Sequence, residues 1–449
     1  MGRSISPLSG FPEFLPAGRV VEQRVVDSLR TTFELHGFCG IQTRAVEPLD
    51  ALSRKGEITK EVYAVRRLHA SGDTGDSLGL HFDLTVPFAR YVLENAGRLE
   101  FPFRRYQIQP AWRGERPQEG RFREFWQADI DVVGQDTLAS HHDVEVVLVM
   151  LEALGRLHRD FGVPPVLMRI NHRLLAQGFY QGLGMADALA AIQAVDKLDK
   201  IGRDGVAQLL SAQGCTETQI ESALALAGIR RTDDSFMAQV QALGVTNEMV
   251  DRGLDELADL HASVSAKFPG QVVVDLAVAR GLDYYTGPVF EVELEGFPGL
   301  GTVAGGGRYD SLASDGKRIY PGVGLSFGIT RVLAPLIGQG TLTASRHVPS
   351  AVLVAVDAEE TRCDADAVAH QLRARGVACE VAPSAPAYGK QIRYAERRGI
   401  PFVWFGGVNG QIKDIRSGEQ VEADATSWSP PDVDARPVVQ PRLLVPSDE

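Results

Sequence analysis

The chain has few cysteines and no long apolar run. Its 449 residues include four scattered cysteines, Cys39, Cys215, Cys363 and Cys379, with no CxxC pair. This spacing argues against a disulfide framework and a cysteine-rich zinc site, and it predicts small core thiols in a reducing compartment. No segment reaches the roughly 20 apolar residues that span a bilayer, and no apolar stretch follows a basic N-terminus. We therefore expect a cytoplasmic protein without membrane contact and without a metal site built from protein ligands alone.

The common phosphate-binding loops are also missing. The sequence has no GxxxxGK[ST] loop and no GxGxxG directly after a predicted strand, which excludes the most frequent nucleotide-binding folds. The net charge of −12 argues against indiscriminate nucleic-acid binding, although a local basic patch in an acidic enzyme still allows a nucleic-acid partner. At this length we expect two or three domains.

A basic hairpin at residues 104–134 stands out within this acidic chain. Residues 104–124 hold six arginines and three glutamates. At the strand period of two, one face of the second strand carries Arg121, Arg123, Phe125, Gln127, Asp129 and Asp131, and the other carries Phe122, Trp126, Ala128, Ile130 and Val132. The polar face predicts the floor of a site that binds an anion at one end and a donor-rich group at the other. A solvated hairpin is the alternative, which the phenylalanine between arginines disfavours.

Polar residues gather in three more segments, at 83–85, 280–285 and 324–331. Together with the hairpin they supply arginines, carboxylates and a tyrosine pair, a set that suits an anionic nucleotide beside a small zwitterion. Two alternatives remain open. The glycines of AGGGRYD (304–310) form either a tight turn or a close approach of backbone to ligand, and the tyrosine pair is either core or site.

Periodicity predicts the elements in outline. We expect a run of helices, inserted as a domain, between strands on either side, and an alternating α/β unit near the C-terminus. The predicted segments are helix 18–36, strand 41–46, strand and helix within 78–92, helix 142–160, strand 166–170, helices within 172–265, strands 272–278 and 290–294 (the latter with one wet face), a strand and a helix start within 322–333, an α/β unit over 352–405, and a loosely held Pro-rich tail from 429.

Five ordered motifs resemble a known family. WRGERPQEGRFREFWQADIDVVG resembles motif 2 of class II aminoacyl-tRNA synthetases, specifically the histidyl enzymes, and GVGLSFGITR resembles motif 3. FDLTVPFAR and RGLDYYTGPVFEV resemble the two histidine-binding segments of that family. The helix and strand before Pro48 lie where motif 1 belongs, and the C-terminal α/β unit is similar to the family's anticodon-binding domain. The resemblance covers about residues 8–428.

The resemblance implies an α+β fold. The expected architecture is a class II antiparallel sheet core flanked by helices, with a helical insertion and a C-terminal α/β anticodon-binding domain. The implied boundaries are 1–170 for the catalytic core with motifs 1 and 2, 171–267 for the insertion, 268–340 for the rest of the core, 347–428 for the anticodon-binding domain and 429–449 for the tail.

The resemblance also implies a reaction. A histidine–tRNA ligase activates L-histidine with ATP, Mg²⁺ being bound with the ATP, and transfers histidine to the 3′ end of tRNA(His). The family pattern implies a homodimer built through motif 1. The alternative is a non-catalytic paralogue that acts as regulatory subunit of ATP phosphoribosyltransferase, and a tRNA-sensing module is a third interpretation. Retention of the motif arginines disfavours both.

Site residues carry over position by position. The catalytic residues implied are Arg113, Arg280 and Arg331. The histidine-binding residues are Asp83, Thr85, Gln127, Asp131, Tyr284 and Tyr285. The ATP-binding residues are Arg113, Glu115, Arg121, Phe125 and Arg331. The tRNA contacts are Arg116 and Gln118, with Arg121 nearby, and Lys390, Arg393 and Arg397 on one helix face. Two positions depart from the pattern: Thr330 stands where many class II enzymes have an acidic residue, and His81 replaces a basic or tyrosyl residue.

Overall fold

The structure is a computed structural model that describes residues 6–52, 61–68, 78–279 and 284–442. The chain divides into two compact units. The first comprises residues 1–12 and 26–335, and the second comprises residues 13–25 and 336–449.

The first unit is built on a nine-stranded sheet of order β1-β5-β6-β12-β11-β10-β7-β9-β8. All neighbours from β5 to β7 are antiparallel, whereas β1–β5 and β7–β9 are parallel. The strands are β1 (Cys39–Gly40), β5 (Phe103–Trp112), β6 (Glu124–Val133), β7 (Val166–His172), β8 (Arg230–Arg231), β9 (Val272–Asp275), β10 (Pro288–Leu294), β11 (Thr302–Tyr309) and β12 (Gly322–Gly328). The expected α+β fold with a largely antiparallel sheet is confirmed.

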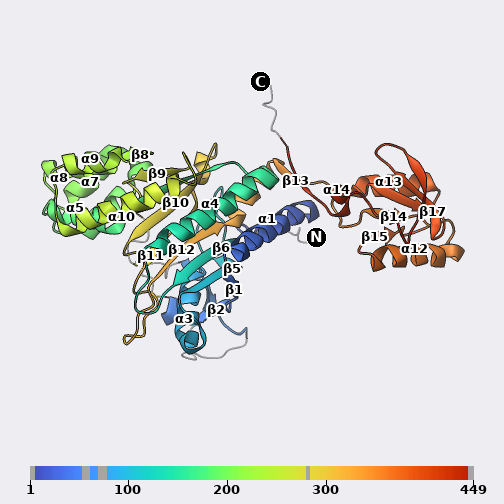
Figure 1. Ribbon diagram of the computed structural model, residues 1–449, viewed down its shortest axis with the longest axis horizontal. Coiled ribbons are helices and arrows are strands. Elements are labelled where there is room, and N and C mark those ends of the chain that lie inside the picture. Colours follow the sequence, from blue (N-terminus) through green and yellow to red (C-terminus); the bar gives the residue numbers. More distant parts are fainter. Residues whose placement is uncertain (1–5, 53–60, 69–77, 280–283, 443–449) are drawn as a thin grey trace, which may run out of the picture. The chain divides into compact units, whose positions relative to one another are not determined.

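Helices cover this sheet. Helix α4 (His141–Phe161) lies along one face and contacts β12 and β6 (Figure 1). Gly162, at φ 72°, ends α4 in the left-handed conformation that glycine adopts at low cost. A small sheet of β2 (Val46–Pro48), β4 (Leu78–Leu80) and β3 (Ala64–Val65) adjoins α2 (Leu49–Leu52), which contacts α3 (Thr85–Asn95).

Residues 173–265 form the expected run of helices. They are α5 (Arg173–Gly182), α6 (Ala188–Val195), α7 (Leu198–Ala212), α8 (Glu217–Ala227), α9 (Ser235–Ala242) and α10 (Glu248–Ser265). They gather at the β9–β8 end of the sheet (Figure 1). Thr216 and Gln219 form a reciprocal capping box at the start of α8, and Asn247 caps α10. The segment is therefore a mainly helical addition to one end of the sheet, to which its β8 contributes the edge strand.

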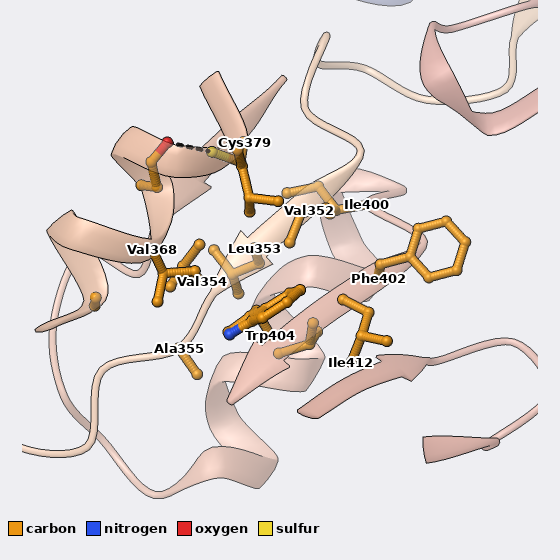
Figure 2. Packing of buried hydrophobic residues seen from close by; sticks show 14 of the residues in the cluster. Val352, Leu353, Val354, Ala355, Val368, Cys379, Ile400, Phe402, Trp404 and Ile412 are labelled. Atoms are coloured by element: carbon orange, nitrogen blue, oxygen red, sulfur yellow. Dashed lines mark hydrogen bonds between the residues drawn. The ribbon is translucent and has the colours of Figure 1, made fainter. Parts of the chain in front are cut away.

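The second unit contains a five-stranded mixed sheet of order β15-β14-β16-β17-β18. Its elements are β14 (Val352–Val354), α12 (Arg362–Ala374), β15 (Cys379–Val381), α13 (Tyr388–Arg398), β16 (Phe402–Phe405), β17 (Asn409–Asp414) and β18 (Gln420–Asp424). Val352, Leu353 and Trp404 are fully buried in its core (Figure 2). The expected α/β alternation is present, and two antiparallel strands extend it.

The Pro-rich tail is better held than expected. Its β19 (Val439–Pro441) pairs with β13 (Leu342–Ala344), and α14 (Asp432–Ala435) precedes that strand. The Asp434 carboxylate lies 2.8 Å from the Arg416 guanidinium. The prediction of a loosely held tail is wrong for these residues, because strand pairing and an ion pair fix them.

Several local predictions also need correction. The strand expected at 41–46 is replaced by β1 and β2 on either side of it. Of the two alternatives left open for the glycines of AGGGRYD, the tight turn does not hold, because these glycines lie inside β11. The face of β10 expected to be wet is only partly so, since Glu291 is buried beside Arg169, whereas 35% of the Glu293 side chain is exposed. Cys39 and Cys363 are exposed, so only Cys379 is the buried core thiol that we expected of all four.

Helix α1 (Pro16–Leu35) has its predicted apolar stripe. Val21, Val25, Leu29 and Phe33 recur at a spacing of four and are all fully buried in the single chain. A dimer interface on this helix would therefore use other residues than the stripe.

Candidate active site

A cavity of about 240 Å³ opens over the end of β6 where it meets β12 and β11. Its wall combines arginines and an aromatic ring from the hairpin with small residues from the two neighbouring strands. The lining residues are Arg113, Glu115, Gly120, Arg121, Phe122, Phe125, Gln127, Thr302, Val303, Ala304, Gly305, Ser326, Gly328 and Arg331. Six of the sequence-predicted site residues thus meet at one place.

Arg113 is held by its neighbours at the end of β5. Its Nε donates to the Phe82 carbonyl at 3.0 Å, and its guanidinium lies 5.2 Å from the centre of the Phe125 ring. With 34% of its side chain exposed, Arg113 is fixed at one edge and open at the other. A planar guanidinium fixed in this way is suited to a phosphate or carboxylate.

Glu115 lies between two arginines in the hairpin loop. Its carboxylate is 3.7 Å from Arg113 and 3.4 Å from Arg121. Arg123 donates from Nε to the Glu115 carbonyl at 3.2 Å, which fixes the loop backbone. The carboxylate therefore partly offsets the positive charge that the two arginines bring to the cavity.

Arg331 enters the same cavity from the first turn of α11 (Ile329–Gly338), the helix that follows β12. Its guanidinium donates to the Leu300 carbonyl, at 2.9 Å from Nε. The preceding Thr330 is buried, and its Oγ1 accepts from the Trp126 amide at 2.8 Å. Since the β12–β6 ladder ends at Gly328 opposite Gln127, the threonine satisfies the next amide of β6. The departure at Thr330 thus has a structural role.

His81 also has a structural role. It is fully buried, and its two ring nitrogens lie 3.2 Å from the Arg44 carbonyl and 2.8 Å from the Pro110 carbonyl. The imidazole therefore ties the small β2–β4 sheet to β5, beneath the loop that carries Arg113.

The polar face of the hairpin continues below the cavity as a buried charge cluster. Arg105 on β5 is fully buried and lies 2.6 Å from Asp131 and 3.9 Å from Asp129. The Tyr309 hydroxyl donates to Asp131 Oδ1 at 2.8 Å. Burial raises the pKa of Asp129 to about 7, although Arg105 opposes the shift. Burial beside Asp131 raises the pKa of Tyr309 well above its ordinary value.

Glycines make room for this cluster. A Cβ on Gly324 would lie 2.1 Å from Asp131 Oδ1, and one on Gly322 would lie 2.6 Å from the Tyr309 ring. A Cβ on Gly307 would meet the Tyr285 ring at 3.0 Å. The glycines of β11 and β12 are therefore needed for close packing around Asp131 and Tyr285, and Gly305 also lines the cavity.

Gln127 connects the buried cluster with the cavity wall. Its Nε2 donates to Ser326 Oγ at 2.7 Å, and Ser326 in turn donates to Asp129 Oδ1. Only 8% of Gln127 is exposed, and within the described part of the chain its Oε1 has no hydrogen-bond partner. A buried acceptor left unpaired beside a cavity favours a ligand that donates there.

The other predicted histidine contacts do not line this cavity, and Tyr284 lines the second cavity. Asp83 is buried and accepts from the Val86 amide at 3.0 Å, one turn into α3, whose first residue is Thr85. The rings of Tyr284 and Tyr285 are 4.2 Å apart. Arg280 lies outside the described residues, and its role stays a prediction.

A second cavity, of about 1320 Å³, adjoins the first and shares Arg121, Thr302 and Arg331 with it. It extends toward Lys200 in the first turn of α7 and is lined by Gln118. Among the predicted tRNA contacts, Arg116 and Gln118 are exposed in the hairpin loop. In the second unit, Lys390, Arg393 and Arg397 are all exposed on α13.

Two searches of the described residues bear on metals and membranes. They contain no group of three or more His, Cys, Asp or Glu side chains arranged to hold a metal ion. None of the described helices combines the length and apolarity needed to cross a membrane.

Sequence reasoning did not include Arg105, Ser326 or Tyr309 among the site residues, nor Asp129, which it placed only on the polar face. One signal was available for Arg105. The first hairpin strand places Arg105, Gln107 and Gln109 at period two, opposite Asp131, Asp129 and Gln127. Ser326 and Tyr309 gave no local signal, since they reach the cluster through pairing of distant strands.

Comparison with known proteins agrees with this geometry. The histidyl-tRNA synthetase family profile matches residues 10–332, and an anticodon binding domain profile matches residues 350–425. The chain is 60% identical to the histidine–tRNA ligase of Cutibacterium acnes over 97% of this chain and 98% of that one. The crystal structure of histidyl-tRNA synthetase from Nostoc sp. PCC 7120 is similar with a TM-score of 0.82 and 32% identity, covering 94% of this chain and 98% of that one.

A further solved structure shares the fold alone. It is described as an ATP phosphoribosyltransferase regulatory subunit/histidyl-tRNA synthetase from Bacillus halodurans, with 19% identity and a TM-score of 0.70 over 88% of this chain and 97% of that one. The match of the first profile to most of the chain, together with the near full-length relatives, settles the family. The chain belongs to the histidyl-tRNA synthetase family.

Proposed function

We propose that this chain is a histidine–tRNA ligase, which activates L-histidine with ATP and transfers histidine to the 3′ end of tRNA(His). The observation that carries this proposal is the cavity at the end of β6. Arg113 and Arg331 enter it from separate motifs, and Gln127 leaves an unpaired acceptor at its wall within the described structure. The arrangement provides cationic groups for ATP and an acceptor for the amino group of an amino acid.

In the first step, a carboxylate oxygen of histidine attacks the α-phosphorus of ATP. The bond from that phosphorus to the bridging oxygen breaks, and pyrophosphate leaves. Two anions must approach one another, so positive charge aimed at the α-phosphate lowers the barrier. Arg113 would supply this charge, and the family pattern gives Arg280 a role at the same phosphate. Arg331 would hold the γ-phosphate. The enzyme would thus accelerate the reaction mainly by positioning the substrates and by stabilising charge in the transition state.

The adenine would lie against Phe125, with Glu115 and Arg121 at its edge. Phe125 already contacts the Arg113 guanidinium, so one face of the ring can hold the arginine while the other takes the base. Mg²⁺ would be bound with the ATP, as the family pattern implies.

Histidine would bind over the polar face of β6. Gln127, Asp83 and Thr85 would accept from the ammonium, and Asp131, Tyr284 and Tyr285 would meet the imidazole. Support for the ring contacts comes from the Asp131–Tyr309 bond, which fixes the carboxylate. A buried carboxylate and hydroxyl would be left unsatisfied by an apolar isostere, so they would also reject such substrates.

The tRNA acceptor end would reach the site through the second cavity, past Gln118 and Arg116, where Arg121 lines both cavities. Assembly as a homodimer through motif 1 and a cytoplasmic location are further parts of this proposal. The homodimer is what the family pattern implies, and the cytoplasmic location rests on the proposed reaction, since protein synthesis supplies the tRNA.

One prediction tests the C-terminal unit. Replacing Lys390, Arg393 and Arg397 together by alanine is expected to raise the KM for tRNA about tenfold and to weaken its salt dependence, because phosphate contacts release counterions. Aminoacylation at several salt concentrations measures both. ATP–pyrophosphate exchange needs no tRNA and serves as the control, so an equal loss in exchange would count against a tRNA role.

The first test of the proposed function is ATP–pyrophosphate exchange with each of the twenty amino acids. Exchange with histidine alone is the expected result. A folded protein that binds histidine without exchange would favour the regulatory paralogue instead. The retained Arg113 and Arg331, and the presence of the C-terminal unit, disfavour that alternative.

A further inference from the structure

A chain of hydrogen bonds leads from the cavity wall into the buried charge cluster. Gln127 donates from Nε2 to Ser326 Oγ at 2.7 Å, and Ser326 donates to Asp129 Oδ1. Asp129 and Ser326 are directly opposite one another on β6 and β12, and Gln127 is two residues before Asp129 on the same face. We call Gln127, Ser326 and Asp129 the relay.

The chemistry of each member sets the direction of the relay. An ionised carboxylate only accepts hydrogen bonds, so Asp129 takes the single proton of the Ser326 hydroxyl. The serine oxygen must then accept from its other neighbour. Gln127 can donate to the serine oxygen only through its amide nitrogen, Nε2. Because the amide group is planar, Oε1 then points away from Ser326. In the described structure this Oε1 is buried and has no partner.

We propose that Asp129 and Ser326 are positioning residues for amino-group recognition, because they fix the Gln127 amide with its oxygen left over for the substrate ammonium. This inference rests on the proposed function and deepens it. Without the relay, the two ends of the amide are nearly equivalent in shape, and the amide is free to offer its NH₂ group, which repels an ammonium donor.

The surroundings of Asp129 make its charge state sensitive to pH. Arg105 on β5 and Asp131 on β6 face it, Ser326 bonds to it from β12, and Asp83 acts on it from the start of α3. Burial raises the pKa of Asp129 to about 7, Arg105 and the serine bond lower it, and the two aspartates raise it. Below that pH the protonated Asp129 carboxyl can donate to Ser326 as well as accept from it. The serine is then no longer required to accept from Gln127, and the orientation of the Gln127 amide is no longer fixed.

A pair of ligands isolates amino-group recognition from every other contact. L-histidine and its desamino analogue, 3-(imidazol-4-yl)propionate, share the ring and the carboxylate and differ in the ammonium. Their dissociation constants are measured by calorimetry on the full-length protein without ATP, and the preference is the ratio of the two. Damage to packing weakens both ligands alike and leaves the preference unchanged.

The expected result is a preference for histidine that falls about tenfold in Ser326→Ala and in Asp129→Asn, the scale of one hydrogen bond to a charged group. Ser326→Thr keeps the hydroxyl and should stay near the wild type. Ser314→Ala is the matched control, because it removes a serine hydroxyl of the same unit that lies outside both the cavity and the relay and accepts from the Gly316 amide. In the wild type the preference should also fall between pH 8 and pH 6, and Ser326→Ala should remove that dependence.

Each outcome decides between the proposals. An unchanged preference in Ser326→Ala overturns the relay, and so does a loss in Ser326→Thr equal to that in Ser326→Ala. Should Asp129→Asn fail to fold, Ser326→Ala and the pH comparison decide alone. A folded wild-type protein that does not bind histidine would instead overturn the proposed function itself.

Discussion

Replacing Arg113 by alanine is expected to slow histidine-dependent ATP–pyrophosphate exchange by about 10²–10³-fold, the usual effect of removing one group that stabilises transition-state charge. The guanidinium is oriented by the Phe82 carbonyl and by the Phe125 ring, so its charge is aimed before ATP arrives. The loss should fall mainly on kcat, because the interaction strengthens as charge develops in the transition state.

Arg104→Ala is the matched control for this experiment. Arg104 lies on the strand that leads to Arg113, and its Nε pairs with Glu145 at 2.9 Å. The rate of ATP–pyrophosphate exchange by the Arg104→Ala variant should stay within a few-fold of the wild-type rate. Arg113→Lys should recover only part of the activity, since a lysine lacks the planar fork. An Arg113→Ala enzyme with a normal kcat would show that the phosphate is held elsewhere.

Replacing Arg105 by methionine is expected to cost about 3–5 kcal/mol of stability, as is usual when one member of a buried ion pair is removed. Arg105 is fully buried, and it is the cation that lies 2.6 Å from Asp131 and 3.9 Å from Asp129. Its removal leaves two buried carboxylates whose charges repel one another. Urea denaturation followed by a signal from the first unit measures the change.

The loss in Arg105→Met should depend on pH. The folded-state pKa of Asp129, about 7, lies above its ordinary value of 3.8, so the folded protein binds this proton more tightly than the unfolded chain. The contribution of Asp129 to stability is therefore greatest at low pH and is lost as the pH rises toward 7. Since Arg105 lowers the pKa of Asp129, removing Arg105 raises that pKa further, and the stability contribution of Asp129 is then lost over a range that extends to higher pH. The Arg105→Met variant should therefore have a lower free energy of unfolding at pH 8 than at pH 6.

Arg104→Met provides the control for stability. The Arg104–Glu145 pair is partly exposed, and such pairs contribute about 0–1 kcal/mol. Equal losses for Arg104→Met and Arg105→Met, or a loss in Arg105→Met that does not vary with pH, would contradict the charge cluster as described.

Some features of the fold could be predicted from short-range pattern alone. The apolar stripe of α1 and the alternation of β6 follow from periods that neighbouring residues display by themselves. The same alternation placed Gln127, Asp129 and Asp131 on one face, and the structure has them there. The local pattern of the Pro-rich tail wrongly predicts a loosely held segment. The strand that pairs with β19 lies nearly a hundred residues earlier in the chain, so the local pattern does not reveal this pairing.

The sequence by itself determined the family, the basic hairpin and the residue types that meet at the site. Only the tertiary structure decided which partner each polar side chain takes. Gln127 and Ser326 are 199 residues apart, and Tyr309 and Asp131 are 178 apart. These contacts arise from the order of strands in the sheet, which local periodicity does not encode. The buried charges on β5 and β6 persist because that order brings them their partners.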